Sequence, residues 1–361
     1  MDDDPVRILA IDVGAGTQDI LVYESDRRPE NCVKLVLPAQ TQVVAARIRR
    51  VTARGIPLHL AGPVMGGGAS SAAVVEHLAA GLPVSAAMDA ARTLHNDLER
   101  VRAMGVTLRD EPPDGAAVLH LGDVDLDAIA EALERFEVPL PTRHAVAVQD
   151  HGYLPGAGGR EFRYEFLQGL LDRGGDVLNM VFREPPDYML RMRAVRQALP
   201  GAVVMDTGAA AVLGILGDPV VARAALGEGA ILVNIGNMHT FGVALRGTRI
   251  YGLFEHHTGG IDATVLEHLV ERLRSGRLTN EEVHRYGGHG AAFDPAFAAL
   301  DPIGFVAITG PNRDRARGLG YYEAVPHGDM MLSGPFGLVE GTLRLLDREG
   351  RRSGLSLVAT G

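Results

Sequence analysis

The 361-residue sequence has one cysteine, Cys32, one lysine, Lys34, and no tryptophan. A single thiol forms no internal disulfide, and it cannot supply the roughly three or four thiolates that hold an iron–sulfur cluster. A phosphate-binding loop of the Walker type needs a lysine directly after a glycine, whereas Lys34 stands in the strand-like segment CVKLVLP. That setting also disfavours a pyridoxal phosphate Schiff base. The sequence therefore argues against a disulfide framework, a P-loop and a cluster held by its own cysteines.

Positive charge and long apolar runs are also scarce. The chain carries 35 Lys and Arg residues against 45 Asp and Glu residues, a formal net charge of −10, which disfavours binding to nucleic acid or to an anionic membrane. No apolar run reaches the roughly 18 residues of a membrane-spanning helix, and no charged-then-apolar leader precedes the first strand-like run. Because a single cysteine also suits a reducing compartment, the expected location is cytoplasmic.

Glycine is abundant, with 45 residues, and it gathers where strand-like runs end. Residues 8–13 and 19–23 are two apolar runs joined by a glycine turn, and residues 32–37 complete an expected antiparallel meander. Strand-like and helix-like segments then alternate, with one long amphipathic helix expected over residues 87–105. This alternation predicts an α/β layered protein.

The first hairpin has an internal counterpart. Residues 230–245 repeat the layout of residues 8–23: an apolar strand, a polar residue, an apolar residue, a glycine turn and a second strand. In this alignment Asp12 corresponds to Asn234. Two such hairpins in one chain indicate two similar domains that face each other; the alternative is a coincidence between two short hairpins.

Five segments, in order, resemble those of the actin-like ATPase superfamily, which contains sugar kinases, heat-shock chaperone ATPases and actin. They are DVGAGTQD, DTGAAAVLG, NIGNMHT, ITGPNRDRA and GPFGLVEG. The resemblance implies an α/β fold of two actin-like (ribonuclease H-like) domains with a central nucleotide cleft. We place these domains at residues 1–205, which include inserted α/β segments, and 206–361, which include the adenosine segment and a returning helix.

The chain also resembles a family labelled "putative pyruvate formate-lyase activating enzyme". The segments that carry this likeness are MGGG (65–68), QDHG (149–152), EHHTG (255–259) and GDMMLSGPFGL (328–338). A glycyl-radical activase needs a set of closely spaced cysteines to hold its cluster. Because Cys32 is alone, we reject the chemistry in that label and do not expect a radical-SAM activase.

The resemblance to the actin-like superfamily implies ATP and Mg²⁺ as cofactors, bound by backbone at the glycine turns. Glycine lets successive amides converge on a phosphate without obstruction by side chains. The expected nucleotide-binding residues are Gly14, Ala15, Gly16, Thr17 and Gln18 in the first turn, and Gly236, Asn237, Gly310, Pro311 and Asn312 later in the chain. The plainer alternative is that these segments are ordinary turns.

Two aspartates are the expected catalytic and Mg²⁺-binding residues. Asp12 ends the first strand, where a carboxylate suits a hard cation, and Asp206 opens the first connecting helix. As alternatives, Asp12 and its neighbour Asp19 cap a tight turn, and Asp206 is a helix N-cap. The superfamily pattern usually has aspartate where this chain has Asn234. That departure puts efficient hydrolysis in doubt more than nucleotide binding.

Histidines and carboxylates outside these segments form a second candidate group. They are Asp150, His151, Glu255, His256 and His257. Imidazole together with carboxylate suits Zn, Fe or Mn, so the group is a candidate substrate site or second metal site. The two adjacent histidines are expected to point to opposite faces of an extended segment. Each histidine taken singly is more simply a hydrogen-bonded structural residue.

Three functions follow from these patterns. The first is an ATPase or phosphotransferase that binds MgATP between two domains and acts on a small-molecule or protein acceptor. The second is a nucleotide-dependent switch or activator with little turnover, which Asn234 favours slightly. The third is a metal-dependent enzyme that uses the same scaffold without ATP. A homo-oligomer is compatible with each, whereas a dinucleotide-binding dehydrogenase is not expected because DVGAGTQD leads into a strand.

Overall fold

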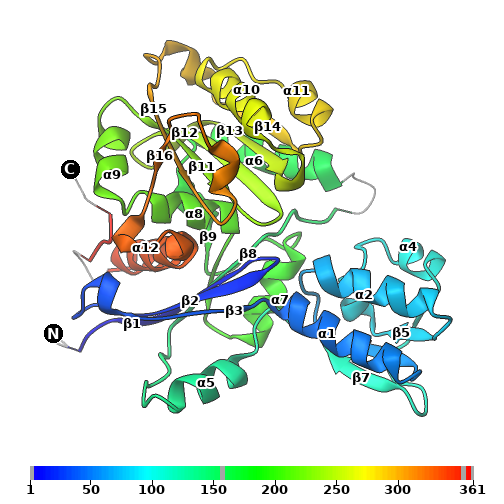
Figure 1. Ribbon diagram of the computed structural model, residues 1–361. Helices are drawn as coiled ribbons and strands as arrows, with labels where there is room; N and C mark the ends of the chain where they lie inside the picture. Colours follow the sequence, from blue (N-terminus) through cyan, green and yellow to red (C-terminus); the bar gives the residue numbers. More distant parts are fainter. Residues whose placement is uncertain (1–3, 155–158, 351–354, 359–361) are drawn as a thin grey trace.

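Three β-sheets organise the computed structural model, which describes residues 4–154, 159–350 and 355–358 (Figure 1). The first sheet has the strand order β3-β2-β1-β8-β10-β9. Its strands are β1 (Arg7–Val13), β2 (Thr17–Glu24), β3 (Val33–Pro38), β8 (His144–Val148), β9 (Val181–Phe182) and β10 (Val203–Met205). The strands β1, β2 and β3 form an antiparallel meander, as the sequence predicts, and β8 and β10 continue the sheet in parallel with β1.

The second sheet repeats this arrangement, in the order β14-β13-β12-β11-β15-β16. Its strands are β11 (Ala230–Ile235), β12 (His239–Arg246), β13 (Arg249–His257), β14 (Gly290–Phe293), β15 (Phe305–Thr309) and β16 (Tyr322–Glu323). Again the first three strands form an antiparallel meander, and β15 and β16 run parallel to β11. The strand order 3-2-1 followed by two parallel strands is the ribonuclease H-like core, so the chain contains two actin-like units, as predicted. The domain boundary at residue 205 stays a prediction.

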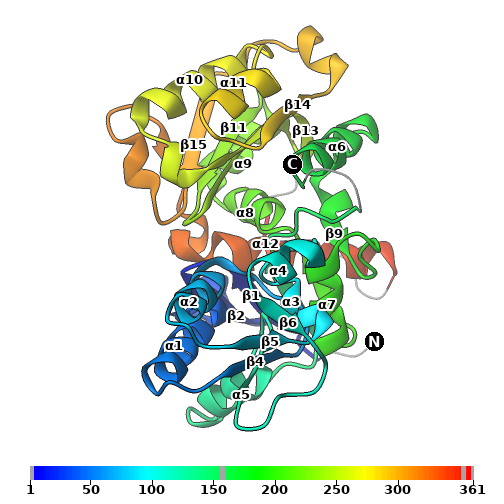
Figure 2. The same ribbon diagram turned by 90° about the vertical axis from the view of Figure 1, so that its right-hand side faces the viewer.

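A smaller parallel sheet is inserted between β3 and β8, in the order β6-β5-β4-β7. Its strands are β4 (Leu58–Ala61), β5 (Val84–Ala86), β6 (Val106–Leu108) and β7 (Ala117–His120). Figure 2 shows it with its own helices, α1 (Gln40–Ala53), α2 (Gly68–Ala79), α3 (Met88–Ala91) and α4 (Leu98–Ala103). These elements enclose a separate apolar core.

The prediction of a single long helix over residues 87–105 is wrong. The structure has α3 and α4 there, separated by a turn. Asp97 is the N-cap of α4, and its side chain accepts a hydrogen bond from the amide of Glu99. The ring of His95 in turn accepts from the amide of Asp97 at 2.9 Å. Side chains that bond to nearby backbone compete with a continuous helix, so the amphipathic pattern breaks at this point.

The remaining helices cover the two large sheets. They are α5 (Leu126–Glu134), α6 (Gly159–Asp172), α7 (Leu190–Ala198), α8 (Thr207–Ile215), α9 (Pro219–Leu226), α10 (Ala263–Arg274), α11 (Asn280–Arg285) and α12 (Ser333–Arg348). Buried residues of α10 pack on one face of the second sheet, and those of α7 pack on the outer face of the first. Among the described residues no single helix is long and apolar enough to cross a membrane. Helices α8 and α9 reach that length and apolar content only when taken together, and the pair is bent by 94°.

Helices α8 and α12 lie between the two large sheets and share one core with both (Figure 1). Small residues let them cross at very short range. A Cβ atom built on Gly214 of α8 falls 1.7 Å from the carbonyl oxygen of Ser333, and one on Gly337 of α12 falls 1.8 Å from that of Ala210. We call the part of the molecule built on each large sheet a lobe. Backbone therefore touches backbone at the junction of the two lobes, and no side chain fits between the helices.

Gly337→Ala is therefore expected to destabilise the protein by about 1–3 kcal/mol or more, because a rigid backbone contact has to open. Thermal unfolding measures the effect. The control is Gly169→Ala in α6, where the nearest atom to the added Cβ is a flexible guanidinium nitrogen of Arg173 at 3.2 Å and alanine favours the helix. Equal melting temperatures for the two variants would contradict the tight crossing.

Candidate functional site

A cavity of about 290 Å³ lies between the two large sheets. Residues at or just beyond the carboxyl ends of β1, β8 and β10 line it from the first sheet, and residues after β11 and β15 line it from the second. The first turns of α8 and α12 and the glycines at positions 66–68 also contribute to the lining. Ligands of open α/β sheets bind at the carboxyl ends of parallel strands, where neighbouring strand connections diverge. This cavity is therefore the candidate functional site.

Many of the residues predicted from the sequence meet in this cavity. Its lining includes Asp12, Gly14, Ala15, Thr17, His151, Asp206, Gly236, Asn237, Glu255, Gly310 and Pro311. Within the described part of the chain, the lining leaves out Gly16, Gln18, Asp150, His256, His257 and Asn312. The structure thus gathers predicted residues from six separate places in the sequence, and it assigns several others to supporting positions.

The two glycine turns are local equivalents that meet across the cavity. The amide of Gly14 donates to the carbonyl of Thr17 at 2.9 Å, and the amide of Gly236 donates to the carbonyl of His239 at 3.0 Å. A Cβ atom on Gly16 would lie only 3.0 Å from the side-chain nitrogen of Asn237. The turns of the two lobes are therefore almost in contact. Since the amides of Gly14 and Gly236 are used within their turns, an anion bound here would meet the amides that follow them.

The residues left out of the lining have structural partners. Gln18 donates to the carbonyl of Pro38 at 3.0 Å, and Asn312 donates to the carbonyl of Gly236 at 3.0 Å. Asp150 accepts from three backbone amides, including that of Arg191 at 2.8 Å. The fully buried ring of His256 bonds the carbonyl of His257 at 2.8 Å. These contacts hold the turns and loops that form the cavity wall.

Two aspartates from the first sheet face each other beside the cavity. Asp12 on β1 is directly opposite Asp19 on β2. Each has a buried carboxylate oxygen, Oδ1, without a hydrogen-bond partner among the described residues. Burial raises the pKa of Asp12 well above its usual range, and the charge of Asp19 raises it further. Like charges opposite each other in a sheet are destabilising, so the pair is suited to a bound cation.

The second sheet lacks this acidic pair. Its equivalent positions hold Asn234 and Phe241, which are opposite each other on β11 and β12. Both residues line the cavity. At this pair of positions the negative charge therefore comes from the first sheet alone, whereas the second sheet brings the carboxylate of Glu255 on β13 to the cavity.

Asp19→Asn is expected to stabilise the metal-free protein at neutral pH. Burial raises the pKa of Asp19 from 3.8 to about 7, so the folded state holds a proton that the unfolded state has released. The contribution of Asp19 to stability is thus fully present below about pH 4 and is lost as the pH rises through about 7. The variant should gain melting temperature over the wild type at pH 8, and the difference should vanish near pH 4. A pH-independent difference in thermal unfolding would refute this.

A buried ion-pair network of Arg163, Asp206 and Glu255 forms part of the cavity wall. Asp206 is the N-cap of α8, where its Oδ1 accepts from the amide of Gly208 at 3.0 Å, and its Oδ2 lies 3.0 Å from a guanidinium nitrogen of Arg163. Arg163 also donates to Oε2 of Glu255 at 2.7 Å. Burial raises the pKa of Asp206 despite this cation. Burial alone would also raise the pKa of Glu255, but Arg163 and His151 hold it well below its usual range.

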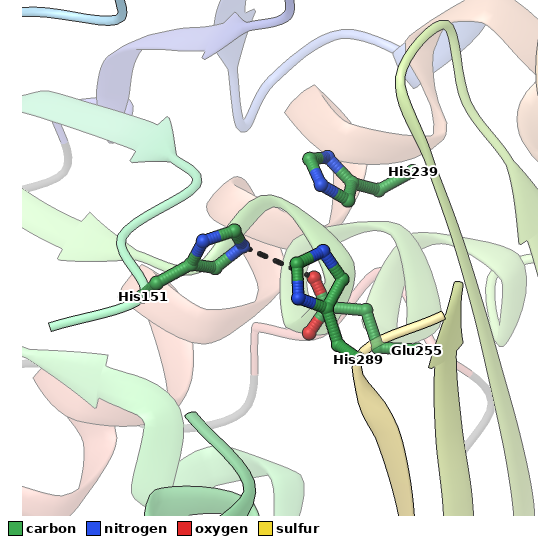
Figure 3. A group of neighbouring side chains, drawn as sticks. All are labelled: His151, His239, Glu255 and His289. Carbon is green, nitrogen blue, oxygen red and sulfur yellow. Dashed lines mark ion pairs between the residues drawn. The ribbon is translucent and has the colours of Figure 1, made fainter. Parts of the chain in front are cut away.

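Four side chains gather at one side of the cavity, as Figure 3 shows: His151, His239, Glu255 and His289. One potential ligand atom from each lies within 4.8 Å of the others. His151 and His239 line the cavity with Glu255, and His289 lies behind them and is buried. Burial lowers the pKa of both His239 and His289 to about 3. Their imidazoles are therefore neutral near pH 7.

A second ion pair fixes the inserted sheet to the first one. Arg191 of α7 forms two bonds to the carboxylate of Asp123, at 2.6 and 2.7 Å, and donates to the carbonyl of Gln149 at 3.0 Å. Asp123 also accepts from the amide of Gly66. The MGGG segment thereby reaches the cavity at the start of α2.

Sequence reasoning missed Arg163, Arg191, His239 and His289. His239 follows the second glycine turn directly, in NIGNMHT, and His289 stands in the glycine-rich YGGHG, so both had a local signal. Arg163 belongs to α6, in a stretch between residues 153 and 202 whose hydrophobic pattern is loose. Nothing local distinguishes it from a surface arginine, because its two acidic partners are far away in the sequence.

Comparison with known families gives one match. A family model described as "Putative pyruvate format-lyase activating enzyme (DUF1786)" matches residues 65–315. The matched region contains strands β5, β6 and β7 of the inserted sheet, though not β4, and most of the second lobe, with all four residues of the His–Glu group. A search of curated proteins gives no match.

Among solved structures, the ethanolamine utilization protein EutJ from Carboxydothermus hydrogenoformans aligns with 15% identity and a TM-score of 0.32, over 92% of this chain and 89% of that chain. The Aquifex aeolicus PPX-GPPA enzyme aligns with 10% identity and a TM-score of 0.28, over 85% and 68% of the two chains. A chain of the PilM-PilN type IV pilus biogenesis complex aligns with 14% identity and a TM-score of 0.34, over 96% and 99%. The assignment of the fold rests on the strand order described above.

Proposed function

We propose that this chain, which belongs to the family described as "Putative pyruvate format-lyase activating enzyme (DUF1786)", binds ATP with Mg²⁺ and acts as an ATPase or a phosphotransferase. One observation carries the proposal: two equivalent glycine turns, one from each ribonuclease H-like unit, meet across a cavity beside an unpaired buried carboxylate. The activity in the family description needs a cluster of cysteine ligands, and Cys32 is the only cysteine in the sequence.

The phosphates would lie between the two turns. The amides of Gly14 and Gly236 already donate within their turns, so the phosphates would be bound by the amides that follow them, at Ala15 and Gly16 and at Asn237, with Thr17 in the same lining. Asp12 and Asp206 would hold Mg²⁺, a hard cation that prefers carboxylate and phosphate oxygens. The unsatisfied Oδ1 of Asp12 and the raised pKa of both carboxylates fit this role, because a cation would remove the cost of their buried charge.

The adenosine would lie against the backbone after β15. Gly310 has φ +102°, and a Cβ atom there would fall 2.5 Å from the carbonyl oxygen of Ile235. Only glycine fits this bend, which leaves an open surface next to Pro311 at the cavity. Asn312 holds the loop, because its side chain donates to the carbonyl of Gly236 and its amide donates to that of Ile235.

Bound MgATP would supply a phosphoryl group that is already activated for in-line transfer. The chain's own residues would orient the phosphates with backbone amides and exclude water by closure of the lobes about the crossing of α8 and α12. The acceptor, a small molecule or a protein side chain, would enter beside Glu255 and His151. Asn234 is the one observation that favours a switch, because an amide is no general base and binds Mg²⁺ poorly.

Calorimetric titration of ATP into the full chain, with and without Mg²⁺, tests the proposal. We expect one site per chain and a clear dependence of affinity on Mg²⁺. Phosphate release from the bound nucleotide then distinguishes the enzyme from the switch: steady turnover supports the enzyme, and tight binding without turnover supports the switch. Failure to bind ATP in the presence of Mg²⁺ would overturn both.

A further inference from the structure

The His–Glu group described above brings together residues from both lobes. His151 follows β8 of the first sheet, whereas His239, Glu255 and His289 belong to β12, β13 and the segment before β14 of the second. Figure 3 shows the three rings and the carboxylate turned toward a common centre, with the dashed line marking the 3.4 Å pair of His151 and Glu255. Any ion held at that centre would join the two lobes.

The spacing of these atoms suits a metal ion. Bonds of about 2.1 Å from a metal to nitrogen or oxygen place opposite ligands about 4.2 Å apart. The four candidate atoms all lie within 4.8 Å of one another. Small side-chain rotations would therefore close the group around one ion, without movement of the strands that carry it.

The buried imidazoles lack other partners. Neither ring nitrogen of His239 nor of His289 has a hydrogen-bond partner among the described residues, although these atoms are buried. A buried polar atom without a partner costs about 1–3 kcal/mol. Four such atoms on two adjacent rings are a large penalty for a purely structural cluster, whereas coordination of a metal by one nitrogen of each ring would offset part of it.

The surrounding contacts hold the group in the way that outer partners hold metal ligands. Arg163 binds Oε2 of Glu255, which leaves Oε1 turned to Gln149 and His151. The amide of His289 donates to the carbonyl of Glu255 at 2.8 Å, and its own carbonyl accepts from the ring of His284 at 2.9 Å. Two of the four positions are therefore locked by bonds that do not use the ligand atoms.

We infer that His151, His239, Glu255 and His289 form a site for a divalent first-row transition metal, separate from the proposed Mg²⁺ position. Three imidazoles and one carboxylate suit Zn²⁺, Fe²⁺ or Mn²⁺, whereas Mg²⁺ prefers a shell of oxygen atoms. Because three of the four residues line the cavity, an open coordination position would face it. The ligand taken there is an anionic oxygen group, such as a carboxylate or phosphate, and the ion would tie the lobes together across the cavity.

The ligand set differs from the pair of adjacent histidines in the EHHTG segment. His256 points away from the group and is fully buried against other backbone. His256→Gln is therefore a matched control for His239→Gln: each replaces a histidine of the second sheet, and only one of them removes a proposed ligand.

The experiment uses the full chain, stripped of metal with a chelator and kept free of nucleotide. Zn²⁺ and Co²⁺ are titrated in competition with a chromophoric chelator, and the Co²⁺ form is examined by visible absorption. We expect one equivalent bound, a loss of affinity of about 100-fold or more in His239→Gln and in Glu255→Gln, and a wild-type result for His256→Gln. Circular dichroism shows whether each variant is folded.

Two results would overturn the inference. One is wild-type affinity for Co²⁺ no greater than that of a folded His239→Gln variant; the other is an equal loss in His256→Gln. Neither involves ATP, so failure of the metal site and failure of the proposed nucleotide site are distinguishable. If His289→Gln alone misfolds, the His239→Gln and Glu255→Gln variants still decide the question.

Discussion

Replacement of Asp12 by asparagine is expected to remove the Mg²⁺ dependence of ATP binding and to lower the affinity for MgATP by about 100-fold or more, as for the loss of one partner of a buried charge pair. The Oδ1 of Asp12 is buried and unpaired among the described residues, and the charge of Arg191 offsets only part of the rise in the pKa of this carboxylate. Its Oδ2 is pressed against α12, since a Cβ atom on Gly334 would lie 2.0 Å from it. Asparagine keeps the shape and removes the charge.

The same variant should be more stable than the wild type when metal is absent, because burial and Asp19 disfavour the ionised form of Asp12. Stability and binding should therefore change in opposite directions, which separates a lost ligand from a damaged fold. Asp26→Asn, at an exposed position on the surface, is the control and should change neither quantity. Calorimetry and thermal unfolding give the two readings. Undiminished MgATP affinity in Asp12→Asn would remove this residue from the site.

Arg163→Met is expected to destabilise the protein by about 3–5 kcal/mol, because the change leaves Asp206 and Glu255 buried together without their shared cation. Arg163 itself is 1% exposed, so water cannot replace the lost partner. A second change, Glu255→Gln, removes one of the two carboxylates that Arg163→Met leaves unpaired, and it should restore part of the stability. Thermal unfolding of the single and double variants measures both effects.

Arg49→Met provides the comparison. Arg49 forms an ion pair with Glu76 at 2.8 Å, but both side chains are about half exposed, and such surface pairs contribute little to stability. A similar loss in Arg49→Met and Arg163→Met would mean that the buried network does not hold the lobes as described. A double variant no more stable than Arg163→Met would mean that charge burial is not the cause.

The sequence predicts the parts of this molecule whose cause is local. The turn at Gly14 to Gly16 and its repeat at Gly236 are visible because each places glycine between two apolar strands. The close crossing of α8 and α12 is foreseeable from their small residues. Residues 87–105 show the limit of a periodic pattern, since one capping aspartate, Asp97, divides it.

The site is less accessible from sequence because its contacts are long-range. Arg163 meets Glu255 across 92 positions of the chain. His151 meets the second-lobe histidines only because β8 ends and β12 begins at the cavity. No local pattern marks which of the histidines will converge. His256 and His257 stand out as a pair in the sequence, whereas the four proposed ligands include His239 and His289. Of the pair, His257 lies beside them, with its ring 4.4 Å from that of His289.

A crystal structure of the full chain with Mg²⁺ and a non-hydrolysable ATP analogue tests the central claim most directly. The account predicts the triphosphate between the 14–18 turn and Gly236–Asn237, with Mg²⁺ on the side of Asp12 and the adenine near Gly310. A nucleotide bound on any other surface, or an empty cavity at saturating MgATP analogue, would contradict it.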